Sequence, residues 1–307
     1  MQTSPIIAVT LGSNGFHLFE VAEDQGKLET INHLYENVQA ESYLDDEAMF
    51  SDEGVSEILS ALRKFGNHVM LNPGCAAAIA TGSFRRAKNA DVVIESAGQE
   101  LGIPIRVLSG QDESLLCYLG IASSTGFAEH NRLVMDIGGG STELMIARKN
   151  VLERFFSLDI GCVSLTRKAF GAGEIKEAHF QDAVEIARKC FQPVSRQLGD
   201  LGWNEVMGCG GTVSSLYAVL QVQRMAGRFI TGAGLSRFEN AVIEKGSAFP
   251  LCKAIVPSDR SRVLPAGVSI LSALFEVLKI EKLTPVFSSV GQGLIVKIIQ
   301  EQKRMVK

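Results

Sequence analysis

The feature that most constrains the fold of this chain is a repeated pattern of three strands. Residues 5–39 predict a strand, a glycine turn (LGSNG), a second strand, a hairpin turn at 23–27 and a third strand. Residues 132–165 predict the same order, with the glycine turn IGGGS. Placing Thr10 over Asp136 gives an offset of 136 − 10 = 126 residues, which brings Gly12 onto Gly138. A repeat of this length predicts two sister domains and not a solenoid.

Each predicted meander is followed by helices mixed with further short strands. The first half predicts helices at 51–68, 89–101 and 109–123; the second half predicts helices at 174–200, 212–226, 236–246 and 258–279, a strand at 284–289 and a closing helix. Antiparallel meanders combined with alternating strands and helices indicate an α/β layer fold. The small, polar segment SSTGFAEHN marks the boundary, so the predicted domains are residues 1–126 and 127–307.

Composition excludes several classes of protein. The formal net charge is −4, which offers no global positive field for duplex nucleic acid. The six cysteines are scattered without a CxxC pair, which favours reduced thiols and a cytoplasmic location. The N-terminus lacks the features of a signal peptide, and we expect no membrane span because no uninterrupted apolar run approaches about 18 residues.

The segment DIGGGSTEL at 136–144 carries three consecutive glycines between two carboxylates. A hairpin turn takes one or two glycines, so three exceed that need. Without Cβ atoms, successive backbone N–H groups can face one spot and form an anion nest. Ser141 and Thr142 add hydroxyl donors, and Asp136 at the strand end can hold a metal ion. A plain tight hairpin is the alternative interpretation.

A second glycine loop, GCGGT at 208–212, follows an apolar strand and opens a helix. That geometry favours phosphate, because the free N–H groups and the helix dipole both attract an anion. The loop is neither a Walker A motif nor a complete GxGxxG fingerprint. A simple tight turn is the competing interpretation.

The segment SGQDESLLCYLG at 109–120 predicts a helix start, because Ser109 and Asp112 match a capping box. Glu113 then lies in the first turn. From spacing alone, Glu113 complements the helix dipole; the functional alternative is a carboxylate that orients a water molecule.

Taken together and in order, TGSFRRAKNA, SGQDESLLCYLG, LVMDIGGGSTEL, SLDIGCVSLT and GCGGT resemble the exopolyphosphatase / guanosine pentaphosphate phosphatase (Ppx/GppA) family. The resemblance covers essentially all 307 residues and is to the short form, without additional C-terminal helical domains. It implies two RNase H-like domains of the actin/hexokinase superfamily type, flanking a central cleft.

The resemblance also implies roles for individual residues. Glu113 matches the catalytic base, which overrides its interpretation as a dipole residue, and Asp136 and Glu143 match acidic residues associated with Mg²⁺. The positions implied to bind phosphate are Ser13, Asn14, Arg85, Gly138, Gly139, Gly140, Ser141, Gly211 and Thr212. Arg86 and Lys88 are expected to belong to a solvated helix start.

Three positions depart from the family pattern. Thr10 stands where members usually carry Asp in the first glycine turn, Arg260-Ser261-Arg262 replaces R-A-D, and Gly291-Gln292-Gly293 replaces R-E-G. These departures affect the metal support expected from the first domain and one edge of the cleft.

The expected function is a Mg²⁺-dependent phosphohydrolase. It would release orthophosphate from inorganic polyphosphate, convert pppGpp to ppGpp, or do both. A weakly active or inactive protein that binds polyphosphate or (p)ppGpp is the alternative, and an ATP-dependent kinase or ATPase is a more distant one. The expected partners are these phosphate compounds, with no duplex nucleic acid and no membrane; a homodimer is left open.

Overall fold

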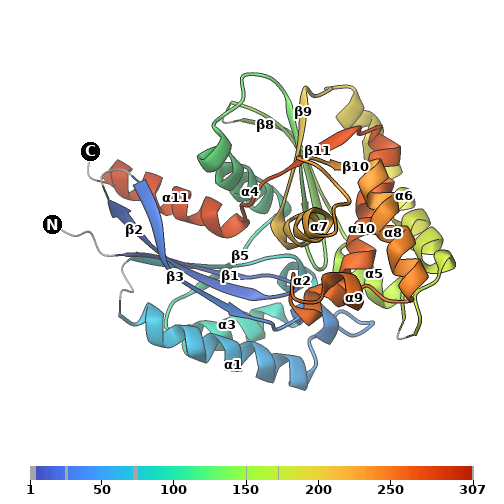
Figure 1. The fold of residues 1–307 in the computed structure, drawn as a ribbon. Helices are drawn as coiled ribbons and strands as arrows, with labels where there is room; N and C mark the ends of the chain where they lie inside the picture. Colours follow the sequence, from blue (N-terminus) through green and yellow to red (C-terminus); the bar gives the residue numbers. More distant parts are fainter. Residues whose placement is uncertain (1–4, 25–26, 72–74, 150, 172, 306–307) are drawn as a thin grey trace. The chain divides into compact units, whose positions relative to one another are not determined.

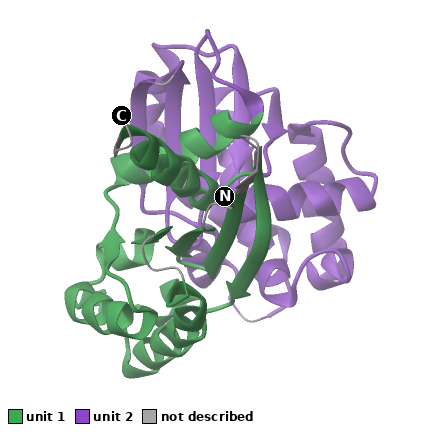
Figure 2. Cartoon of the chain, turned by 90° about the vertical axis from the view of Figure 1, so that its left-hand side faces the viewer, with its two compact units in different colours: residues 1–124, 288–307 green, residues 125–287 purple. Residues whose placement is uncertain are grey.

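The computed structural model describes residues 5–24, 27–71, 75–149, 151–171 and 173–305. The chain divides into two compact units, shown in Figure 2: unit 1 is Met1–Ser124 with Ser288–Lys307, and unit 2 is Thr125–Phe287. The predicted division at residue 126 differs from this at the C-terminal end, because residues 288–307 belong to unit 1 and not to the second domain.

Unit 1 contains a five-stranded sheet of order β3-β2-β1-β4-β5. Its strands are β1 (Ile6–Leu11), β2 (Phe16–Asp24), β3 (Lys27–Glu36), β4 (Ala76–Ala80) and β5 (Ile105–Val107), and all of them except β4 are labelled in Figure 1. The first three strands are antiparallel, whereas β4 runs parallel to both β1 and β5. Residues 25–26 of the predicted hairpin turn lie outside the described residues.

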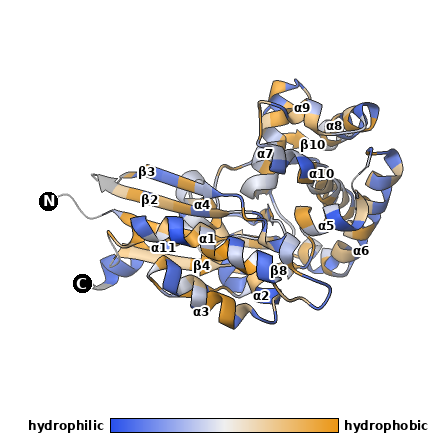
Figure 3. Cartoon of the chain, turned by 90° about the horizontal axis from the view of Figure 1, so that it is seen from below, coloured by the Kyte–Doolittle hydropathy of each residue, from blue (hydrophilic) through white to orange (hydrophobic). Residues whose placement is uncertain are grey.

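The helical elements of unit 1 are η1 (Ala40–Tyr43), α1 (Asp52–Val69), α2 (Gly82–Arg86), α3 (Ala90–Leu101), α4 (Gly110–Thr125) and α11 (Val290–Met305). The α1 helix begins where Ser51 accepts a hydrogen bond from the N–H of Gly54, at 3.2 Å. Along α1 and α3, hydrophilic and hydrophobic residues alternate, as Figure 3 shows. Their apolar faces join Val9 and Leu11 in one core on one side of the sheet.

The opposite side of the unit 1 sheet is covered by α11. Leu294, Ile295 and Ile299 pack in one cluster with Ile6 and Ala8 of β1. A strand that is buried at every position, such as β1, needs cover on both faces. The C-terminal helix supplies the second cover, which explains why residues 288–307 belong to unit 1.

Unit 2 contains a six-stranded sheet of order β10-β11-β9-β6-β7-β8. Its strands are β6 (Arg132–Ile137), β7 (Thr142–Arg148), β8 (Val151–Leu158), β9 (Glu205–Cys209), β10 (Ile230–Thr231) and β11 (Lys282–Pro285). Its helices are α5 (Cys162–Ala169), α6 (Glu177–Gly199), α7 (Gly210–Val222), α8 (Gly232–Lys245), α9 (Phe249–Cys252) and α10 (Ser258–Leu278). Leu133, Met135 and Ile137 of β6 pack into the same core as these helices.

The α10 helix is long and apolar enough to cross a membrane by composition alone. In this structure, however, 78% of that apolar window is buried inside the protein. Burial on this scale is typical of a core helix.

The structure reproduces the sequence repeat strand for strand. An offset of 126 residues carries the first residue of β1 onto the first residue of β6 and the last onto the last. The order β3-β2-β1-β4-β5 in unit 1 recurs as β8-β7-β6-β9-β11 in unit 2. The α/β class and the duplication are therefore confirmed.

One predicted element is wrong. The third strand of the second repeat was expected to continue to residue 165, but β8 ends at Leu158 and α5 begins at Cys162. Gly161 is the N-cap of α5, and an added Cβ there would lie 2.4 Å from the carbonyl of Gly139. A glycine is needed because the helix start lies directly against the glycine loop.

Candidate active site

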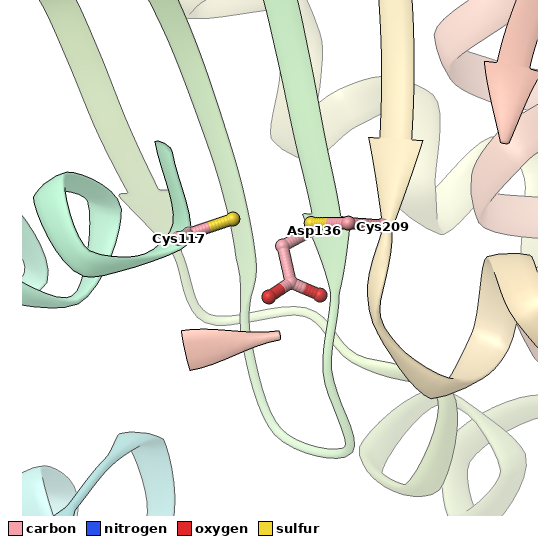
Figure 4. A group of neighbouring side chains, drawn as sticks. All are labelled: Cys117, Asp136 and Cys209. Atoms are coloured by element: carbon pink, nitrogen blue, oxygen red, sulfur yellow. The ribbon is translucent and has the colours of Figure 1, made fainter. Parts of the chain in front are cut away.

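Polar side chains of unit 2 form one row across the sheet at the carboxyl end of β6. Asp136 pairs in register with Cys209 of β9 and with Glu143 of β7, and Glu143 pairs with Ser157 of β8. Register partners point to the same face of a sheet. Figure 4 shows Asp136 and Cys209 at the ends of these neighbouring strands. Glu143 is 2% exposed and accepts a hydrogen bond from the Ser157 hydroxyl at 2.8 Å.

The triple-glycine loop is held in place by the start of α5. The N–H groups of Cys162 and Val163 donate to the carbonyls of Gly138 and Gly139, at 2.9 and 2.8 Å. In a trans peptide, the N–H points opposite to the carbonyl of the same unit. The N–H groups that follow these two carbonyls, those of Gly139 and Gly140, therefore point away from α5. This is the arrangement of an anion nest.

The second glycine loop lies directly beside the first. Thr212, at the start of α7, donates from its hydroxyl to the carbonyl of Ile137 at 2.9 Å. Gly210 has φ +79°, and a Cβ there would lie 2.1 Å from Oδ1 of Asp136. The loop thus needs glycine both for its backbone angle and to admit the carboxylate.

Arg260, on α10, is a site residue for which sequence analysis assigned no role. Its guanidinium lies so close to Gly211 that a Cβ on Gly211 would be 2.4 Å from Nη1. The same arginine acts electrostatically on the Cys162 thiol, whose pKa is raised because it is buried. In the sequence, Arg260-Ser261-Arg262 retains the first arginine of the R-A-D pattern, and this match was the signal that could have identified Arg260. The side chain of Arg260 places a cation beside both glycine loops.

Within unit 1, Glu113 and Arg85 form an ion pair. Nη1 of Arg85 lies 2.7 Å from Oε2 of Glu113 and also donates to the carbonyl of Leu108 at 3.1 Å. Glu113 is 6% exposed, and burial raises its pKa, while Arg85 and a hydrogen bond from Thr81 act in the opposite direction. A carboxyl group with a raised pKa in contact with an arginine is a candidate general base.

The predicted capping box at the start of α4 is present in part. The N–H of Asp112 donates to the Ser109 hydroxyl at 3.1 Å, and that hydroxyl lies 3.1 Å from the Asp112 carboxylate. This cap fixes the first turn, which carries Glu113.

The first glycine turn of unit 1 holds Ser13 and Asn14, both buried. The Ser13 hydroxyl accepts a hydrogen bond from the N–H of Ser83 at 3.1 Å. Nδ2 of Asn14 contacts the Tyr35 hydroxyl at 3.4 Å, whereas its Oδ1 is buried with no hydrogen-bond partner among the described residues. An orphaned polar atom of this kind calls for an additional partner, such as water or a ligand.

The expectation that Arg86 lies in a solvated helix start is wrong. Its side chain is 21% exposed and forms an ion pair with Glu41. Lys88 is exposed, as expected.

The internal repeat shows what unit 1 carries in place of the carboxylates of unit 2. Thr10 occupies the position of Asp136, and His17 occupies the position of Glu143. The His17 ring stacks on that of His33, and the two share a hydrogen bond of 3.0 Å. Burial lowers the pKa of His33.

The other departures from the family pattern have local packing consequences. A Cβ on Gly291 would lie 2.5 Å from the ring of Phe19, and one on Gly293 would lie 1.8 Å from the carbonyl of Leu116. Arg262 is exposed and lines a cavity of about 290 Å³ in unit 2.

The two units, with their matching strand orders and glycine loops, define a duplicated α/β protein. A model of the Ppx/GppA phosphatase family matches residues 21–302. The chain therefore belongs to the Ppx/GppA phosphatase family.

Solved structures show the same fold at low sequence identity. An exopolyphosphatase from Cytophaga hutchinsonii is 19% identical, with a TM-score of 0.86 over 97% of this chain and 98% of that one. The Ppx/GppA family member from Aquifex aeolicus is 22% identical, with a TM-score of 0.78 over 97% and 98%. An exopolyphosphatase-like protein is 19% identical, with a TM-score of 0.83 over 97% and 99%.

Proposed function

We propose that this chain hydrolyses phosphoanhydride bonds, releasing terminal orthophosphate from inorganic polyphosphate, converting pppGpp to ppGpp, or both. Membership of a phosphatase family supports the reaction class, and one of the similar structures is described as an exopolyphosphatase. The observation that carries the proposal is the pair formed by Glu113 and Arg85, because it supplies a buried carboxyl group whose pKa is raised.

Glu113 is proposed as the general base. A base works best when its pKa lies near the working pH, and burial moves the pKa of Glu113 in that direction. The carboxylate would accept a proton from the attacking water as the new P–O bond forms and the anhydride P–O bond breaks. Arg85 favours the ionised form of the carboxyl group, in opposition to burial, and fixes its orientation through the 2.7 Å contact.

The glycine loops of unit 2 are proposed to hold phosphate. The N–H groups of Gly139 and Gly140 point away from α5 and can donate to phosphate oxygens, and Arg260 adds a positive charge beside Gly211. Such fixed donors stabilise the charge that spreads over the phosphoryl oxygens in the transition state.

The residues present fit a magnesium ion. Asp136 and Glu143 are register partners on one sheet face and offer carboxylate oxygens, the ligands that Mg²⁺ takes together with water. Gly210 leaves room for the Asp136 carboxylate, and Ser157 orients Glu143. When bound, Mg²⁺ would neutralise negative charge on the phosphate chain.

One observation favours a second candidate, a protein that binds the same phosphate compounds with little turnover. Thr10 and His17 stand where unit 2 carries Asp136 and Glu143, so unit 1 lacks the corresponding carboxylates. If catalysis needs a carboxylate at residue 10, binding would survive without efficient hydrolysis.

The deciding experiment measures orthophosphate release with Mg²⁺ from long polyphosphate, short polyphosphate and pppGpp. The test variant is Glu113→Gln, and the matched control is Asp91→Asn, an exposed acid in the first turn of α3. Release that is lost in the first variant and kept in the second supports the hydrolase and identifies its substrate. Binding of these compounds without release by the wild-type protein would support the second candidate instead.

A further inference from the structure

The structure places a second buried arginine–glutamate pair beside the first. Arg85 and Arg86 are consecutive residues of α2, and they pair with Glu113 and Glu41 respectively. Residues adjacent in a helix point about 100° apart, so one short helix directs its two cations to two different carboxylates. Glu41 belongs to η1, a segment to which the sequence analysis assigned no role.

Glu41 is deeply buried and well bonded. It is 6% exposed, and its Oε2 accepts hydrogen bonds from the Ser83 hydroxyl, at 2.6 Å, and from Arg86. A carboxylate in such surroundings is strongly unfavourable unless it is paired. Its position is therefore fixed by both partners, which lie on α2.

Glu41 also joins the two elements that grip the first glycine turn. The backbone N–H of Glu41 donates to the carbonyl of Ser13 at 3.0 Å, while the N–H of Ser83 donates to the Ser13 hydroxyl at 3.1 Å. The N–H of Gln39 donates to the carbonyl of Asn14 at 2.8 Å. The turn is thus held from one side by η1 and from the other by α2, and the Glu41 side chain connects the two.

The charge of Glu41 has a consequence for Glu113. The charged groups that act on the Glu113 carboxyl both come from α2: Arg85 directly and Arg86 through space. Arg86 is paired with Glu41, whose negative charge opposes the effect of Arg86 on Glu113. Arg85 is therefore the dominant cation at Glu113.

We propose that Glu41 is a positioning residue that offsets the charge of Arg86 near Glu113 and locks the Ser13–Asn14 turn onto α2. It acts through Arg86 and Ser83 and does not touch the substrate. The role rests on the proposed function in so far as Glu113 is the base.

The test follows the pKa of Glu113 by carboxyl ¹³C NMR and the acid limb of the pH profile of kcat/KM. In Glu41→Gln, the charge of Arg86, no longer opposed by that of Glu41, should lower both by roughly one pH unit. Arg86→Gln should raise both, and the double variant should return close to wild type. Glu100→Gln breaks the exposed ion pair with Arg63 and is the matched control, expected to change neither.

The outcomes separate this proposal from the proposed function. If the wild-type protein releases no phosphate, the proposed function fails, but the NMR titration still tests Glu41. An unchanged pKa of Glu113 in Glu41→Gln, or a double variant that does not return towards wild type, overturns the proposal. If Glu41→Gln alone does not fold, the pKa of Glu113 is compared between Arg86→Gln and the double variant, which differ only in the charge at residue 41. Equal pKa values of Glu113 in those two variants would also overturn the proposal.

Discussion

Gly210→Ala provides a sharp test of how the second glycine loop serves the proposed metal site. Gly210 has φ +79°, and an added Cβ would lie 2.1 Å from Oδ1 and 3.1 Å from Cγ of Asp136. The substitution therefore does two things. It introduces a side chain into left-handed backbone, and it forces the Asp136 carboxylate to move.

The size of both effects can be worked out from the geometry. Left-handed backbone costs a residue with a Cβ about 1–2 kcal/mol of folding stability. Relieving the contact with Asp136 requires a shift of about 1 Å, several times the roughly 0.2 Å within which metal–ligand distances are held. We expect the affinity for Mg²⁺ or Mn²⁺ to fall about 10- to 100-fold, measured by calorimetric titration. Urea unfolding of the same samples gives the stability cost.

Gly202→Ala is the matched control. Gly202 has φ +61°, and an added Cβ would meet nothing within 4 Å. It should show the stability loss of left-handed backbone alone, about 1–2 kcal/mol, without any loss of cation affinity. Equal cation affinity in Gly210→Ala and Gly202→Ala would refute the assignment of Asp136 as a metal ligand positioned by this loop.

Three further predictions concern unit 1. Arg85→Ala should raise the pKa of Glu113 still further, because burial then acts without its main opposing cation, and the acid limb of the rate profile should move to higher pH; an unmoved limb would argue against Glu113 as the base. Since a folded-state pKa above the ordinary glutamate value means that the native state binds the proton more tightly than the unfolded chain does, stability should decline as the pH rises from that ordinary value through the folded-state pKa. Gly293→Ala should destabilise the protein by at least about 3 kcal/mol in urea unfolding, because its Cβ would lie 1.8 Å from the carbonyl of Leu116. Gly199→Ala, whose Cβ meets nothing, should cost little; equal costs would contradict the packing argument.

The sequence predicted the unit 2 part of the candidate site because its parts lie close together along the chain. Asp136, the triple glycine and Glu143 occupy the end of one strand, a turn and the start of the next. In an antiparallel hairpin the register follows from the turn. The two carboxylates therefore had to face each other, as they do.

Contacts between distant parts of the chain gave no comparable signal. Arg260 reaches Gly211 from a different helix, and Glu41 reaches Arg86 from the far side of the first glycine turn. Charge and polarity alone made Arg86 look like a solvated residue, because the sequence does not show which carboxylate a cation will meet. Only packing brings the two together.

The α5 helix was missed for a related reason. Its first residues, which are separated from β8 by residues 159–161 alone, carry the β-branched and apolar side chains that are typical of strands. The carbonyls of Gly138 and Gly139 accept from its first N–H groups, and this tertiary contact favours a helix start.

The sequence by itself determined the duplication, the α/β class and the two glycine loops, because each depends on local patterns of hydrophobic residues and glycines. The tertiary structure decided which carboxylate each arginine pairs with, and it packed the last helix, α11, against the sheet of unit 1. An apolar helix face such as that of α11 requires a partner, but the hydrophobic effect is non-directional and does not specify which one. The free face of β1 became that partner because its side chains fit those of α11 and needed cover of their own.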